Sequence, residues 1–351
     1  MPDLHDDNFD AKHFKKVEYN VRKIENMYEN LLEDILREIS LGMIDKSKMF
    51  KFSDYPALKN KVDKLMEQFT KNVTAELFTQ VEDSWKNGEE KLNRLAKKVG
   101  ERLGTPPEIM KEYLQPNKAA LKKFRERVDE GMDLSKRVWN LNKEYKANLE
   151  LALDVGISTG TSAQKMMYVV NQYLNEPKLI YGHEVNSRGM RAMTKIPENY
   201  NPGRGIYRSP LKNAYRLTRT ENNIAYHQAT NEKYQKFDFV RGYLVKLSNN
   251  PKHCPFCEAM AGEYPKDLKF FGWHPQCRCT TVPLLKTWEE MERDNDLIWQ
   301  GKEPGPAANE VTEIPDKFQD WIINNREQIH RARNKPYFIK FNMDVVGHLL
   351  K

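Results

Sequence analysis

Apolar residues in the N-terminal half recur every three or four positions, and this spacing constrains the fold more than any other feature of the chain. One run comprises Phe14, Val17, Val21, Ile24, Tyr28, Leu31 and Ile35. A second, after a break at Pro56, comprises Leu58, Val62, Leu65, Phe69, Val73, Leu77, Val81 and Trp85. Such spacing keeps apolar side chains on one face of a helix. The sequence therefore predicts two long amphipathic helices that pack against each other.

A third long helix is predicted further along the chain. Its apolar face comprises Leu134, Val138, Leu141, Tyr145, Leu149 and Ala152. Before it, the segment Gly104-Thr105-Pro106-Pro107 ends the preceding helix, because proline lacks the amide donor and restricts its neighbour. The apolar stripes fit either the core of a bundle or a seam for a partner, and we favour the core. Residues 1–155 are thus expected to form a helical bundle or coiled docking region.

The rest of the chain mixes strand and helix patterns. A helix is expected from Pro210 to about Lys236. A half-buried strand should follow, because Phe237, Phe239, Tyr243, Val245 and Leu247 place an apolar residue at every second position apart from Arg241. The tail, residues 286–351, places Phe318, Trp321, Ile322 and Ile329 at helical intervals and is expected to form a helical accessory region. We therefore expect an α+β, predominantly helical protein, with a small α+β domain at residues 156–285.

All cysteines lie in one short stretch of this second domain. Cys254 and Cys257 form a Cys-x2-Cys knuckle, and Cys277 and Cys279 follow His274 in the segment HPQCRC. Zinc in structural sites takes four tetrahedral sulfur or imidazole ligands, and such a knuckle supplies two of them from one turn. The sequence therefore predicts a structural zinc site, in preference to buried reduced thiols without metal, to disulfides or to a catalytic centre.

Five candidate ligands compete for four positions in this site. In an extended segment Cys277 and Cys279 point the same way, so both can reach one ion and leave His274 to orient a ligand. Alternatively, His274 and Cys277 ligate and Cys279 is a buried thiol. Catalytic zinc keeps an open position and a nearby base, yet the His-x-Glu of zinc deaminases does not precede this knuckle. We predict no catalytic residue.

Composition bears on compartment and partners. The start, MPDLHDDNFDAKHF, is acidic, the reverse of a secretory signal, and no run approaches the roughly 20 apolar residues of a membrane helix. We therefore expect a cytoplasmic chain without membrane contact, where clustered cysteines are more often metal ligands than disulfides.

The formal charge of +7 is concentrated in residues 178–220, which we call the basic arm. Such an arm fits a phosphate-binding or partner-binding surface, or equally a solvated linker. Its candidate binding residues are Arg188, Arg191, Lys195, Arg204, Arg208 and Lys212.

The order of motifs between residues 155 and 285 resembles one known family. Arg219-Thr220-Glu221 lies on the predicted helix before the strand, and the knuckle, the segment AMAGEY and HPQCRC follow. A preceding segment contributes Gly160, Ser162, Met166, Tyr173, Leu174 and Asn175. Together these motifs resemble the Mu F-like head-morphogenesis family, the minor head proteins of tailed bacteriophages and prophages.

The resemblance implies a minor capsid protein, present in few copies, that acts in head morphogenesis. Its implied partners are the portal protein and capsid or scaffold proteins, with packaged double-stranded DNA as a further partner of the basic arm. Its implied location is the bacterial host cytoplasm during assembly and then the virion head. The competing hypotheses are a zinc-stapled nucleic-acid-binding module and, less favoured, an effector enzyme such as a nuclease or an ADP-ribosyl transferase. For Arg219 and Glu221 we expect a salt-bridged helix surface.

Overall fold

The structure is a computed structural model, and it assigns most of the chain to two compact units. It describes residues 8–42, 44–45, 48–129, 131–159, 183–185, 191–193, 210–248, 254–332 and 335–351. Unit 1 comprises Met1–Glu18, Thr79–Glu126 and Arg219–Lys351, and unit 2 comprises Tyr19–Phe78 and Arg127–Thr218. Each unit combines segments that are distant in sequence, so neither coincides with one of the three consecutive regions expected above. The reason is that long helices contribute one end to each unit.

The long helices follow the apolar patterns closely. They are α1 (Asn8–Ser40), α2 (Pro56–Leu103), α5 (Leu134–Thr159) and α9 (Pro210–Lys236), with the short α3 (Pro107–Leu114) and α4 (Lys118–Arg125) after α2. Helix α2 ends where Gly104 adopts a left-handed φ of 62°, as the glycine and prolines predict. The segment 160–175, which contributes to the family resemblance, lies outside the described residues. Among the described helices, none has the length and apolar character needed to cross a bilayer.

Unit 2 is a helical bundle with an apolar interior. Its largest buried rings, Tyr28, Phe69 and Tyr145, meet edge to face, with ring centroids 4.7 and 4.8 Å from that of Tyr28. The Tyr28 hydroxyl donates to Asn142 Oδ1 at 2.7 Å, and the Asn142 amide donates to Thr70 Oγ1 at 2.9 Å. Asp154 in addition accepts from the backbone amide of Phe50 at 2.7 Å, so these buried polar groups have partners, as buried polar groups must.

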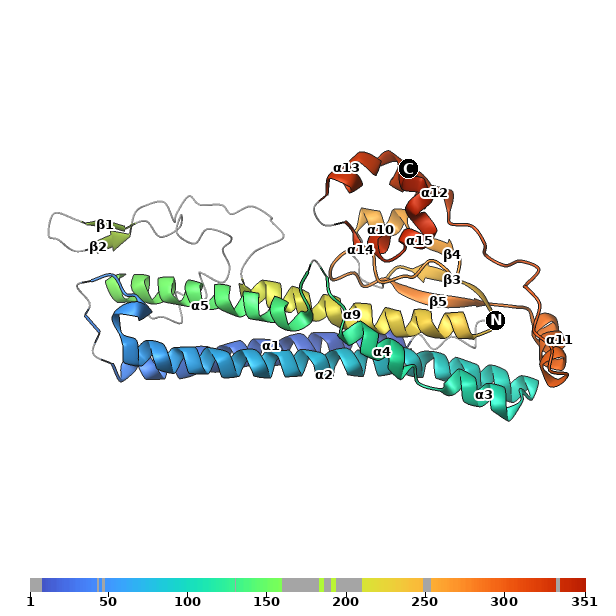
Figure 1. Cartoon of the computed structure of the whole chain (residues 1–351), viewed down its shortest axis with the longest axis horizontal. Helices are drawn as coiled ribbons and strands as arrows, with labels where there is room; N and C mark the ends of the chain where they lie inside the picture. Colours follow the sequence, from blue (N-terminus) through green and yellow to red (C-terminus); the bar gives the residue numbers. More distant parts are fainter. Residues whose placement is uncertain are drawn as a thin grey trace. The chain divides into compact units, whose positions relative to one another are not determined.

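Unit 1 contains a three-stranded antiparallel sheet in the order β4-β3-β5. The strands are β3 (Val240–Lys246), β4 (Gly262–Tyr264) and β5 (Thr280–Leu285), and the short helix α10 (Pro255–Ala259) lies between β3 and β4 in sequence. The registers pair Tyr243 with Tyr264 on one side and with Pro283 on the other. Within unit 1, one side of this sheet lies towards α9 and the other towards the C-terminal helices (Figure 1).

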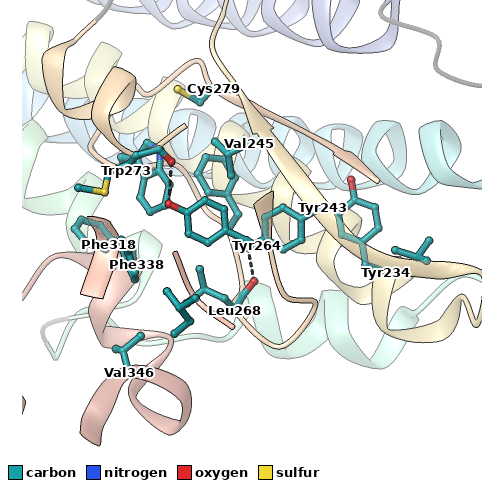
Figure 2. Packing of buried hydrophobic residues seen from close by; sticks show 14 of the residues in the cluster. Tyr234, Tyr243, Val245, Tyr264, Leu268, Trp273, Cys279, Phe318, Phe338 and Val346 are labelled. Carbon is teal, nitrogen blue, oxygen red and sulfur yellow. Dashed lines mark hydrogen bonds between the residues drawn. The ribbon is translucent and has the colours of Figure 1, made fainter. Parts of the chain in front are cut away.

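The C-terminal tail completes the core of unit 1 rather than lying outside it as an accessory region. It contains α11 (Trp288–Trp299), α12 (Asp316–Asn324), α13 (Arg326–Arg331), α14 (Tyr337–Lys340), α15 (Met343–Val346) and η3 (Gly347–Leu350). Phe318 and Phe338 are buried against Trp273, with ring centroids 5.5 and 5.6 Å away (Figure 2). The small sheet could not bury its own aromatic face, and the tail helices cover it.

Helix α9 is the central element of unit 1. From Glu221 to Tyr234 almost every side chain is buried. Helix α2 approaches it at Gly88, where an added Cβ would lie 2.5 Å from the carbonyl oxygen of Tyr226, so only glycine permits this spacing. Tyr234 on α9 stacks on Tyr243 of β3 (Figure 2), with ring centroids 5.7 Å apart. The helix thus connects the sheet to the α1–α2 segments of unit 1.

Candidate metal centre

The five predicted ligands lie in one place in unit 1. Cys254, Cys257 and His274 form one group whose ligand atoms all lie within 4.8 Å of one another, and Cys257, Cys277 and Cys279 form another. Cys257 belongs to both groups, so it occupies the middle of the set. The structure therefore confirms that this Cys/His cluster could hold a metal ion.

The knuckle is built on the start of a helix. Cys254 immediately precedes α10, Pro255 occupies the first helical position, and Cys257 lies in the first turn. Proline suits that position because its missing amide would have no partner there. The carbonyl of Cys254 accepts from the amide of Glu258 at 3.1 Å. This turn directs two sulfurs to one point, which is the local basis of a Cys-x2-Cys site.

The second half of the site is a tight turn at His274-Pro275-Gln276-Cys277. The amide of Cys277 donates to the carbonyl of His274 at 3.0 Å, and Gln276 has a φ of 63°. Proline in the second position and a positive φ in the third are the pattern of a type II turn. Just before it, Gly272 has a φ of 88°, and an added Cβ would lie 2.9 Å from Cys277 Cβ. The backbone therefore folds closely around the Cys277 side chain.

Two of the donor-atom spacings are close to those of ligands that share one metal ion. Cys257 Sγ lies 3.9 Å from Cys277 Sγ and 3.2 Å from His274 Nε2. Two sulfurs bound to one zinc should lie roughly 3.8 Å apart, and a sulfur and an imidazole nitrogen roughly 3.6 Å, given the usual bond lengths. These two distances lie within about 0.4 Å of the values for donors that share one ion.

His274 presents the correct nitrogen to the cluster. Its Nδ1 lies 2.9 Å from the carbonyl oxygen of Pro275, and this contact requires a proton on Nδ1. The lone pair is then on Nε2, the atom that faces Cys257. A ligating histidine is commonly fixed in this way by a carbonyl partner on its other nitrogen. His274 is therefore fit to be a ligand, although Cys254 and Cys279 compete with it for the remaining positions.

The thiols influence one another strongly. Hydrogen bonds from the thiols of Cys257 and Cys279 hold the pKa of Cys277 well below its ordinary value. The contacts with Cys277 and Cys279, together with burial, raise the pKa of Cys257. Cys277 is therefore the thiol whose deprotonation its neighbours favour. A bound divalent cation favours further deprotonation of the sulfurs.

The loop that carries these ligands is fixed to helix α9 by a polar stripe. Its members recur every three or four residues along one face of the helix. Thr220, Asn223 and Asn231 bond to the loop, Tyr234 bonds to Thr281 of β5, and His227 is buried on the same face. Sequence reasoning missed this stripe. The 3–4 spacing of hydrogen-bonding residues was the available signal, but it is equally typical of a solvated helix face.

Asn223 and Asn231 are the clearest members of the stripe, and both are buried. The Asn223 amide donates to the carbonyl of the ligand Cys277 at 2.9 Å. Asn231 brackets the backbone of Phe270, donating to its carbonyl at 2.9 Å and accepting from its amide at 3.4 Å. Buried backbone groups of an irregular loop need such partners. These amides therefore set the position of the ligand loop.

A second layer of polar contacts supports the stripe from α1 and α2. His13 Nε2 lies 3.0 Å from Asn223 Oδ1, and burial lowers the pKa of His13 to about 3. Because Asn223 uses its amide nitrogen on Cys277, its oxygen accepts from a neutral His13. Close by, Lys91 donates to Asp10 at 2.8 Å and to the carbonyl of Thr281 at 2.9 Å. The start of β5 is thereby joined to α1.

Arg219 forms a salt bridge, as expected, whereas Glu221 does not lie on the expected helix surface. Arg219 pairs with Glu18 at 2.9 Å, as a salt bridge, but also donates to Gln276 Oε1 in the metal-site turn at 3.2 Å. The hydrogen bond from Arg219 holds the pKa of Glu18 below its usual value. Glu221 is buried rather than exposed, because its face of α9 is covered within unit 1. The contact of Arg219 with the metal-site loop was not predicted from the sequence.

The structure describes only part of the basic arm. Arg188, Lys195, Arg204 and Arg208 lie outside the described residues. Arg191 begins strand β2 (Arg191–Met193), which pairs with β1 (His183–Val185), and Lys212 is an exposed residue of α9. The interpretation of this arm as a nucleic-acid or partner surface stays a prediction.

Comparisons with family models, with curated proteins and with solved structures give no match to this chain.

Proposed function

We propose that the protein is a structural assembly protein, the minor head protein of a tailed phage or prophage, whose C-terminal module is stapled by zinc. One observation carries the proposal. Three of the motifs that resemble the Mu F-like family, separated along the chain, lie together: Arg219 and Thr220 contact Gln276 in the HPQCRC segment, and the Cys254/Cys257 knuckle lies beside the same segment. A motif order that arises by chance has no reason to converge in space.

Zinc is the metal that best fits the donors. Sulfur and imidazole ligands favour zinc over magnesium or calcium, which take oxygen ligands. With five protein donors at hand, four coordination positions can be filled without water. Cys257, Cys277 and Cys279 are all buried. These features support a closed structural site, and the proposed role is to hold the ligand loop on α9.

The metal assignment is tested by elemental analysis of the full chain purified without a histidine tag. We expect about one equivalent of zinc, together with native thiols that react slowly with an alkylating reagent until a chelator is added. Less than half an equivalent, with four thiols that react freely in the native protein, would contradict the assignment.

The assembly role is tested separately. The full chain is co-expressed with the portal protein encoded beside it, and with capsid and scaffold proteins in parallel. We expect it to co-purify with the portal or with assembling heads in the host cytoplasm and to remain in mature heads. Loss of the gene should reduce infectious particles. Normal particle yield without the gene, and no co-purification, would remove the proposal whether or not zinc is bound.

A further inference from the structure

The turn that carries the ligands contains a backbone conformation that its sequence disfavours. Gln276 has a φ of 63°, and it is the one non-glycine residue with a positive φ in the described part of the chain. Side chains other than glycine reach this left-handed region at a cost. The residue lies between His274 and Cys277, so its conformation decides whether both donors face Cys257.

Two side chains of α9 hold Gln276 in place. Thr220 Oγ1 accepts from the Gln276 amide at 3.3 Å, and Arg219 Nη1 donates to Gln276 Oε1 at 3.2 Å. Both the backbone and the side chain of the strained residue are therefore fixed to the same helix.

Arg219 is itself oriented by α1. Its Nε and Nη2 donate to the two carboxylate oxygens of Glu18 at 3.0 and 2.9 Å, which leaves Nη1 for Gln276. The planar guanidinium fork allows this division of donors, whereas an ammonium group is a point charge without a fixed direction. Arg278, beside the ligands Cys277 and Cys279, also donates to Glu18.

We propose that Arg219, oriented by Glu18, and Thr220 are positioning residues that preorganise the metal centre by holding Gln276 in its left-handed conformation. The inference rests on the proposed zinc site and goes beyond it, since neither residue is a ligand. When these contacts are absent, the turn leaves the conformation that the metal requires, and binding must restore it. Metal affinity then falls although every ligand remains.

The test measures the zinc dissociation constant of the full chain by competition with a chromophoric chelator. Arg219→Ala should weaken binding about 10-fold or more, the usual size of an effect from a group that orients a ligand. Arg219→Lys, which keeps the charge beside Glu18 and is therefore expected to fold, should weaken it to a similar extent because the fork is lost. Thr220→Val should show a smaller loss in the same direction.

The variant Gln276→Gly tests whether Arg219 acts by positioning Gln276 or by supporting the fold in general. Gln276→Gly adopts the left-handed conformation without strain and should bind zinc within about 3-fold of the unmodified chain. Adding Arg219→Lys to Gln276→Gly should then change affinity by less than about 3-fold, because the strained residue that Arg219 holds is gone. Arg331→Ala, which removes an exposed arginine paired with Glu327, is the matched control and should have no effect.

Two results would overturn the inference while leaving the zinc site intact. One is an Arg219→Lys affinity within about 2-fold of the unmodified chain. The other is an Arg219→Lys loss that is equally large in the Gln276→Gly background, which would place the action of Arg219 elsewhere. An unmodified chain that binds no zinc would instead overturn the metal assignment, and this inference with it.

Discussion

The buried polar groups of the two units have different kinds of partner. In unit 2, helices pack against helices, and the polar chain from Tyr28 through Asn142 to Thr70 joins side chains only. In unit 1, Asn223 and Asn231 of α9 bind the backbone of a loop that forms little regular structure of its own. A helix satisfies its own backbone, whereas an irregular buried loop must find partners elsewhere. The comparison shows why α9 buries side-chain amides beside the loop of unit 1, whereas Asn142 of unit 2 bonds to side chains of neighbouring helices.

Metal removal should produce the largest difference in stability between the two units. Chelation is expected to reduce the free energy of unfolding of unit 1 by at least about 4 kcal/mol. Isolated zinc domains lose ~10 kcal/mol or more when the metal is removed. The loss should be smaller here because unit 1 keeps an apolar core. Hydrogen exchange should accelerate between Cys254 and Leu285 and remain slow in the unit 2 part of α5. Zinc, but not magnesium, should restore protection. Equal acceleration in both units would contradict this contrast.

Loss of an aromatic from the core that the tail covers should be nearly as severe. Phe318→Ala removes a fully buried ring packed against Tyr264, Trp273 and Phe338, and we expect it to destabilise unit 1 by about 3–5 kcal/mol. Thermal or denaturant unfolding followed by tryptophan fluorescence measures the effect. The matched variant Ile323→Ala, at an exposed position of the same helix, should change stability by less than about 0.5 kcal/mol. If both variants behave alike, α12 does not belong to the core.

Acid should destabilise unit 1 before unit 2. Burial lowers the pKa of His13 to about 3 and that of His227 to about 4, whereas an unfolded histidine has a value of about 6.5. Below about pH 6.5 these histidines therefore bind protons in the unfolded state but not in the folded state. The free energy of unfolding of unit 1 should fall as pH falls from about 6.5 towards 4.

The expected slope is at most about 1.4 kcal/mol per pH unit for each histidine. The segments of unit 2 within α1, α2, α5 and α9 contain no histidine, so they should lack this dependence. Proton uptake on unfolding near pH 5 measures it directly. His13→Phe should lose about one of the protons taken up, and an unchanged uptake in that variant would show that His13 is not the group responsible.

A single amide in the polar stripe should have an intermediate effect. Asn231→Leu keeps the size of the side chain but leaves the buried carbonyl and amide of Phe270 without these partners. We expect a loss of about 1–3 kcal/mol in unit 1, with faster exchange of the Phe270 amide. Gln228→Leu, at a partly buried position of the same helix that pairs within α9, serves as the control. A neutral Asn231→Leu would show that the loop does not depend on α9 there.

The smallest effect is expected inside unit 2. Tyr28→Phe removes one hydroxyl bonded to Asn142 and leaves the edge-to-face ring contacts intact. We expect a loss of about 1 kcal/mol, measured as a shift of the denaturant midpoint without a change of slope. A loss as large as that of Asn231→Leu would remove the distinction between the two interiors.

Much of the helical structure and the ligand set could be predicted from the sequence. The apolar spacing of α1, α2 and α5 reports burial directly, since those helices present one apolar stripe to a core. Proline and glycine marked the start of α9 and the end of α2. Cysteine spacing identified the residues that the structure brings together as a candidate metal site, because few other arrangements require four thiols so close together.

The polar stripe of α9 and the role of the tail could not be predicted in this way. Threonine, asparagine and histidine at helical spacing suit water as well as a buried loop. What distinguishes the two is the partner, and for Asn223 the partner is the backbone of Cys277, 54 positions later in the chain. Similarly, the apolar face of α12 and α14 needed a surface to cover, which the sheet of unit 1 provides.

The sequence by itself determined where helices form and which side chains can ligate a metal, because both follow from local spacing and donor chemistry. Tertiary structure alone decided that Arg219 and Thr220 contact Gln276, that Glu221 is buried and that Phe318 packs on Trp273. Those outcomes depend on contacts between distant segments, whose hydrogen-bonding and apolar groups find their partners only when the chain has folded.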